Sequence, residues 1–214
     1  MNYHPTHPSP AALWGRWNDY CLKFGLTGLI IAVTLLVAAD RSAAEGVYAG
    51  EDGCKCHKSE IIDWERSKHA KAFDLLLPGK RKAAKTKAGL DPKQDYSRDV
   101  RCIKCHVVGY NSEGGFIDIA TTPAQAGVGC ESCHGPGKSY RIVHGKKPLT
   151  FTKEEVKALG QQYSSSSESV CRNCHEHPDS PFQPHIDAKY RFRHKEALKQ
   201  TDLFHNYYPL KAKH

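Results

Sequence analysis

Hydrophobic positions are concentrated near the start of the chain and are scattered after it. An apolar run covers residues 24–39 and ends at Asp40 and Arg41. As a helix, this run of 16 residues would reach about 24 Å, which is short of the ~30 Å hydrocarbon core of a bilayer. Small residues at 42–44 then suit a signal peptidase. The pattern predicts a signal peptide over residues 1–44, with an uncleaved membrane anchor as the alternative.

Beyond residue 44, apolar positions recur at helical spacing only over short stretches. We expect one helix over residues 57–77, which Pro78 and Gly79 end. Thr152 and Glu155 match a capping box, which predicts the start of another short helix. Further short helices are expected over residues 80–88 and 192–205. Loops rich in glycine and proline connect these elements, so the pattern predicts a mainly α fold of short helices and loops.

The composition changes this picture in two ways. The 214 residues include 31 Lys and Arg against 23 Asp and Glu, a net charge of +8, and a chain this polar would bury a poor core by itself. The basic residues are scattered and no recognition motif accompanies them, so we expect no nucleic-acid partner. A basic face that docks an acidic protein remains open, as does an ordinary solvated surface.

The cysteines carry the chemistry. Eight of the nine cysteines fall in four close pairs, and a histidine directly follows each pair. Three pairs form Cys-x-x-Cys-His, the attachment signature of c-type haem, and the first pair lacks one spacer residue. In chain order the four motifs are Cys54, Cys56 and His57; Cys102, Cys105 and His106; Cys130, Cys133 and His134; and Cys171, Cys174 and His175.

The histidines separate haem from the other uses of paired cysteines. Two thiols add to the haem vinyl groups, and the adjacent imidazole binds the iron, whereas disulfides would need no histidine. Zinc ribbons place their cysteine pairs roughly 15–20 residues apart, but 24 residues separate Cys105 from Cys130. We therefore expect a multihaem cytochrome c fold over residues 45–214, packed around four haem c groups.

Any second iron ligand must also be a histidine. The only methionine is Met1, so the His/Met ligation that raises haem potential is absent and His/His or open sites remain. His/His centres are saturated and pass electrons without binding substrate. Spacing alone does not choose among the histidines left over after residue 44, which are His69, His144, His177, His185, His194, His205 and His214.

A resemblance selects among them. The chain resembles the cytochrome c-554 family of tetrahaem cytochromes at four stretches. These are Trp64 with Ser-Lys-His-Ala-Lys-Ala at 67–72, Leu-Asp-Pro at 90–92, the glycine-rich stretch 127–137 and Asp-Ala-Lys-Tyr at 187–190. The similarity runs from about residue 45 to 208. It implies close stacked pairs of haems and three His/His irons. The implied pairs are His57 with His144, His134 with His205, and His175 with His69; the His106 haem is left five-coordinate.

The resemblance also implies a function. Members of the family take electrons from hydroxylamine oxidoreductase in the periplasm and pass them towards membrane-associated carriers, so we expect an exported electron carrier with redox protein partners. No acid–base or nucleophile constellation indicates an enzyme. The alternative is a catalytic cytochrome that binds or reduces nitric oxide at the His106 haem, because ligand access decides between electron transfer and activation.

The chain departs from the family pattern at two places. The missing spacer residue lies before Cys56, so we predict a haem held by at least Cys56, and the bond from Cys54 is in question. The linker over residues 146–169 is also different and the C-terminal tail is short. By the resemblance, residues 180–182 lie near the pocket over the His106 haem.

Overall fold

The computed structural model describes residues 46–145, 150–162, 167–200 and 202–206. The chain divides into two units, Met1–Glu45 and Gly46–His214. The predicted signal peptide lies in the first unit, outside the described residues, and remains a prediction. In the part of the second unit that is described, no helix is long and apolar enough to cross a membrane.

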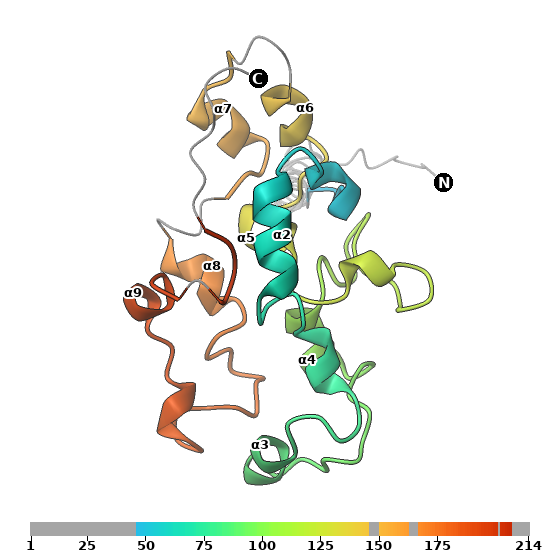
Figure 1. The fold of residues 1–214 in the computed structure, drawn as a ribbon, viewed down its shortest axis with the longest axis vertical. Coiled ribbons are helices and arrows are strands. Elements are labelled where there is room, and N and C mark those ends of the chain that lie inside the picture. Colours follow the sequence, from blue (N-terminus) through green and yellow to red (C-terminus); the bar gives the residue numbers. More distant parts are fainter. Residues whose placement is uncertain (1–45, 146–149, 163–166, 201, 207–214) are drawn as a thin grey trace, which may run out of the picture. The chain divides into compact units, whose positions relative to one another are not determined.

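The described chain is helical, as the sequence predicts (Figure 1). It contains no strand, and its one isolated bridge joins Val107 to Ala126. The α-helices are α2 (Lys58–Arg66), α3 (Lys82–Lys87), α4 (Val100–His106), α5 (Cys130–His134), α6 (Tyr140–His144), α7 (Lys153–Ala158), α8 (Glu168–Arg172) and α9 (His194–Ala197). Short 3-10 helices are η1 (Glu51–Cys54), η2 (Phe73–Leu76), η3 (Pro123–Gln125) and η5 (Ala188–Tyr190).

The single helix expected over residues 57–77 is wrong. The segment forms α2 and η2, and Ser67 between them is extended, with φ −73° and ψ 164°. The backbone groups after the break bond to distant chain: the Lys68 N–H donates to the Asp202 carbonyl, and the His69 carbonyl accepts from Val128. Ser67 itself is buried and its hydroxyl accepts the Ala70 N–H. These tertiary bonds replace the helical ones.

The other helix predictions fare unevenly. The capping box is present at α7, where Thr152 and Glu155 each bond the other's backbone N–H. The expected helix over 80–88 is α3. The helix expected over 192–205 is wrong in length, because only His194–Ala197 is helical. Beyond it, Asn206 donates to Asp63 of α2 through its backbone and its amide, so the last described residue is bonded to a distant helix.

The hydrophobic core is small, as the composition predicts. Its main cluster lies between η2 and α4, and α4 contacts η2 directly. The Phe73 and Phe116 rings lie 5.8 Å apart within it. Cys102 of α4 packs against the cluster from one side. The buried members are Phe73, Leu76, Tyr96, Ile103, Val107 and Phe116.

Candidate haem sites

Each full cysteine motif occupies a helical turn. α4 ends on its motif, α5 consists of its motif, and the last motif begins in α8 and is closed by the His175 N–H, which donates to the Cys171 carbonyl. Residues three and four apart share a face of a helix. The first cysteine of each motif therefore shares a face with both the second cysteine and the histidine, which suits attachment of one macrocycle.

The short first motif is built differently. Cys54 ends η1, and His57 is the N-cap residue of α2. Cys54 is half-buried and its thiol meets the Cys130 thiol, whereas Cys56 is exposed. The prediction that Cys56 holds this haem remains a prediction, and the inward position of Cys54 is a feature that the sequence did not indicate.

Three histidine pairs face one another across the described chain. The ring centres of His57 and His144 lie 6.1 Å apart, with 50° between the ring planes. The ring centres of His69 and His175 lie 6.2 Å apart, with 70° between the planes. Those of His134 and His205 lie 6.2 Å apart, with 25° between the planes. In each pair a motif histidine meets a histidine from a distant part of the sequence.

This spacing suits two imidazoles on opposite sides of one metal. A metal–nitrogen bond of about 2 Å on each side puts the two ring centres roughly 6 Å apart. The chemistry of the rings agrees, because burial lowers the pKa of His69, His134 and His175 and favours the neutral form that binds metals. His144 adds a buried Nδ1 that has no well-formed hydrogen bond. The side chains present thus fit bound haem.

His106 differs from the other motif histidines. Its Nδ1 lies 2.6 Å from the Ala72 carbonyl oxygen, a contact that fixes the ring and directs Nε2 away from η2. Burial lowers its pKa as well. Within residues 46–145, 150–162, 167–200 and 202–206, no second histidine ring pairs with it.

The remaining described histidines form no ring pair with a motif histidine. His185 is exposed. His177 accepts the Asp179 N–H at its Nδ1, 3.1 Å away. His194 lies beside Phe192, which itself stacks on His175 with 4.6 Å between ring centres. His214 lies outside the described residues.

The cysteines show which motifs are neighbours. The Cys54 thiol hydrogen-bonds Cys130, and the Cys105 thiol hydrogen-bonds Cys174. Burial raises the pKa of the Cys133 thiol to about 11, with a further contribution from Cys171. The four attachment sites thus follow one another in the order first, third, fourth, second motif.

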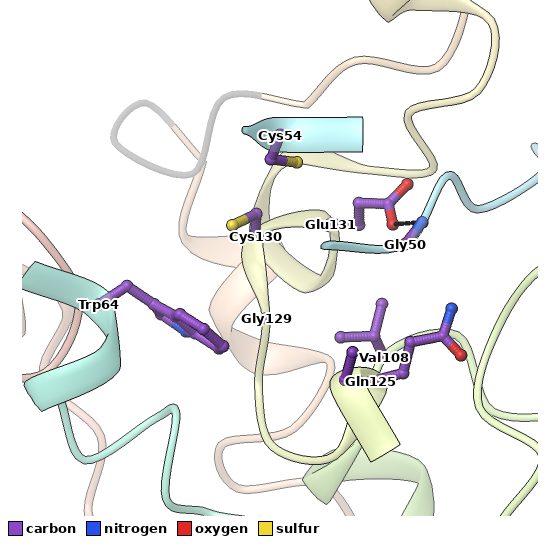
Figure 2. A pocket seen from close by; sticks show the side chains of 9 residues that line it. Gly50, Cys54, Trp64, Val108, Gln125, Gly129, Cys130 and Glu131 are labelled. Atoms are coloured by element: carbon purple, nitrogen blue, oxygen red, sulfur yellow. Dashed lines mark hydrogen bonds between the residues drawn. The ribbon is translucent and has the colours of Figure 1, made fainter. Parts of the chain in front are cut away.

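A pocket lies where the first and third motifs meet. Figure 2 shows the Cys54 and Cys130 sulfurs at this pocket, with the Trp64 indole on another side. The Trp64 indole N–H donates to the Val128 carbonyl, 2.8 Å away, just before the third motif. Gly127 adopts φ +95° beside the Ala70 carbonyl, where an added Cβ would clash. This close approach explains a glycine at that position.

Sequence reasoning missed Glu131, inside the third motif. Its side chain is buried, and its carboxylate accepts three backbone N–H groups. Oε1 lies 2.8 Å from the Ala49 nitrogen and 2.6 Å from the Gly137 nitrogen, and Oε2 lies 2.9 Å from the Gly50 nitrogen. The carboxylate ties the segment before the first motif to the loop after the third. An acidic residue between two haem cysteines is the only signal the sequence offers.

Comparison with known proteins agrees with this geometry. The family model described as cytochrome c554 and c-prime matches residues 53–135. Cytochrome c-554 of Nitrosomonas europaea is 36% identical over 203 residues, which cover 86% of each protein. The solved structure of reduced cytochrome c554 from the same organism gives a TM-score of 0.71 at 36% identity, and the match covers 79% of this chain and 90% of that one.

These comparisons do not support the alternative of catalysis on nitric oxide, whereas they support electron transfer between redox proteins. The resemblance inferred from the sequence is confirmed, and so is the expectation of four haem c groups. The chain belongs to the cytochrome c554 family of tetrahaem c-type cytochromes, which carry electrons.

Proposed function

We propose that the three facing histidine pairs would bind the irons of three haems. Each pair combines a motif histidine with a partner, and the ring centres lie 6.1 to 6.2 Å apart. The cysteines of the same motifs hold the groups covalently, and Cys56 secures the first where Cys54 does not. Because each pair joins distant segments, the ligands would also fix the positions of short helices that lie far apart in the sequence.

We propose that His106 holds the fourth haem from one side only. Its ring is fixed by the Ala72 carbonyl, and no facing histidine is found in the described chain. Bound haem supplies one-electron chemistry at its iron, and the axial ligand and solvent access set its potential. The chain's own groups position the imidazole and cover it with η2.

Histidine ligation on both sides supports a carrier. Three saturated sites exclude substrate from the iron, so these sites serve electron transfer alone. The contacts between motifs make the four sites continuous, from Cys54 and Cys130, through Cys133 and Cys171, to Cys174 and Cys105. This continuity is the observation that carries the proposal, since isolated sites would not connect two partners.

We propose that the carrier works in the periplasm after removal of residues 1–44. The donor would be a hydroxylamine oxidoreductase-like enzyme and the acceptor a membrane-associated carrier, as the resemblance implies. The haem sites do not name the donor, because function depends on the partner surface as well as on the fold. Export is required by the covalent haem attachment, which bacteria carry out outside the cytoplasm.

The visible spectrum of the dithionite-reduced protein, before and after carbon monoxide, tests the proposal. We expect sharp c-type bands and a partial shift with carbon monoxide, equivalent to one haem in four. A complete absence of shift would show that a second ligand caps His106's haem. A shift of most of the band would refute the three histidine pairs.

A further inference from the structure

One short segment holds most of the excess positive charge of the chain. Within residues 80–93 the only acidic residue is Asp91, and the basic residues are Lys80, Arg81, Lys82, Lys85, Lys87 and Lys93. The segment therefore has a net charge of +5, against +8 for the whole chain. It contains α3, which lies next to the loop leading into α4 (Figure 1).

The segment presents this charge to solvent. Lys80, Lys82, Lys87 and Lys93 are exposed, as is Arg81 at the start of α3. The Gly79 N–H donates to the Pro92 carbonyl, 2.8 Å away, which brings the two ends of the segment together. The lysines at those ends therefore lie on one surface.

A second, distant segment adds to the same surface. Asp187 pairs with both Lys87, at 3.0 Å, and Lys189, at 2.9 Å. Asp187 raises the pKa of Lys189, and the charge of nearby Arg81 opposes part of that rise, so the two cations are neighbours. We call the exposed group the basic patch: Lys80, Arg81, Lys82, Lys87, Lys93 and Lys189.

Lys85 connects the segment that carries the basic patch to the second haem motif. Lys85 is the one basic residue of the segment that is not in the patch, because it points inward and is only 3% exposed. Its ammonium donates to the carbonyls of Leu76 and Leu77, at 3.4 and 2.9 Å. It also lies near Cys102 of α4. One residue thus joins the patch to the second haem motif.

We propose that the basic patch is the docking surface for an acidic redox protein, which exchanges electrons with the protein at the His106 site. The proposal rests on the proposed function and adds where a partner binds. In the exchange one electron leaves the reduced partner and converts one ferric iron to ferrous, and no atom or proton is transferred. Complementary charge steers such encounters and raises their rate.

The composition of the patch favours a protein over other polyanions. The large hydrophobic side chains exposed in the described chain are Ile62, Val100, Ile117, Ile119, Ile142 and Leu198, and none lies within residues 80–93. A surface that inserts into a bilayer would carry apolar anchors beside its lysines. Aromatic side chains that would stack on bases are likewise missing from this segment.

The test compares two variants of the haem-loaded protein with the same charge change. Lys80→Glu with Lys82→Glu alters the basic patch. Arg81 is left unchanged because its backbone is left-handed, with φ +51°, and a substitution there could alter the fold as well as the charge. Lys153→Glu with Lys157→Glu makes the same change on α7. The probe is a small acidic [2Fe–2S] ferredoxin of the plant type. Its affinity is measured by calorimetry at low salt, and its electron transfer by stopped flow.

We expect the patch variant to bind ferredoxin roughly tenfold more weakly or worse, with a shallower salt dependence. The affinity of the α7 variant for ferredoxin should stay within about twofold of the wild-type affinity. The affinity of Lys80→Gln with Lys82→Gln should lie between those of the wild type and the patch variant. Equal losses in both charge-reversed variants would overturn the proposal, because general charge would then explain them. Patch-dependent binding to vesicles of anionic phospholipid, with no ferredoxin binding, would also overturn it.

A second measurement separates this proposal from the carrier function. Uncharged lumiflavin semiquinone, produced by a light flash, should reduce the wild type and every variant at the same rate. Failure to reduce the wild type would contradict the carrier function itself. Normal reduction by the flavin together with unchanged ferredoxin affinity in the patch variant would refute the docking surface alone.

Discussion

The rings of His69 and His175 face each other with 6.2 Å between their centres and 70° between their planes. His69 follows the break after α2, and His175 closes the last motif. The His69 carbonyl accepts the Val128 N–H, so the same residue is also bonded to the chain before the third motif. The break in the expected helix therefore positions a histidine that a continuous helix would have held elsewhere.

Replacing His69 by alanine should convert one low-spin haem to high spin. The change removes the ring that faces His175 and leaves that iron with one protein ligand. Electron paramagnetic resonance of the oxidised protein would show a new high-spin signal of one haem per molecule. His185→Ala, at an exposed position, is the matched control and should leave the spectrum as it is. An unaltered spectrum for His69→Ala would disprove the ligand pair.

Replacing Cys54 by serine should leave four haems attached. Cys56 still directly precedes His57, so one thioether and the imidazole remain at the first site. The intact mass of the purified protein gives the number of haems directly. Cys56→Ser provides the comparison, because it leaves only the thiol that meets Cys130. A mass for Cys54→Ser that is short by one haem would show that both sulfurs are needed.

Replacing Lys85 by methionine should lower the potential of the His106 haem. A nearby cation stabilises the reduced iron, which has one positive charge fewer, and Lys85 lies close to Cys102. We expect a fall of tens of millivolts, since a tenfold change in a one-electron equilibrium is about 59 mV. Titration of the high-spin signal would report this haem alone. Lys82→Met, exposed on the same helix, should cause a smaller shift.

The same lysine predicts a dependence on pH. Burial lowers the pKa of Lys85, and this effect exceeds the opposite contribution of Asp95. As the pH rises through the lowered pKa, the ammonium loses its charge and the reduced iron loses that stabilisation. The potential of the His106 haem should therefore fall with rising pH, and this fall should occur at a lower pH than the titration of an ordinary lysine. In Lys85→Met this step should be absent, and its persistence would assign it to another group.

The sequence predicted the chemistry of the sites better than the shape of the chain. A cysteine motif fits within one helical turn, so Cys102, Cys105 and His106 were recognisable from local spacing alone. The second histidines were not, because His69 reaches His175 through a bend that depends on bonds to Val128 and Asp202. Only the resemblance proposed that pair. The buried position of Lys85 was also unpredictable, since α3 looks like a solvated helix in its sequence.

Replacing Glu131 by alanine should destabilise the haem-loaded protein. Its carboxylate accepts the N–H groups of Ala49, Gly50 and Gly137, and no other side chain in the described residues replaces those bonds. Leaving buried donors unpaired costs about 1–3 kcal/mol each, so we expect a loss of at least ~2 kcal/mol in the free energy of unfolding.

Denaturant unfolding, followed by far-ultraviolet circular dichroism, would measure this loss. Glu154→Ala is the control, because that residue is exposed on α7 and does not take part in the capping box; it should change the free energy by less than about 0.5 kcal/mol. Glu131→Gln should fall between the two, since its amide oxygen still accepts hydrogen bonds but carries no charge. Equal stability of Glu131→Ala and Glu154→Ala would mean that the three bonds contribute nothing beyond what water provides. The segment before the first motif would then depend on its other backbone bonds, from the Tyr48 N–H to the Glu113 carbonyl and from the Lys138 N–H to the Val47 carbonyl.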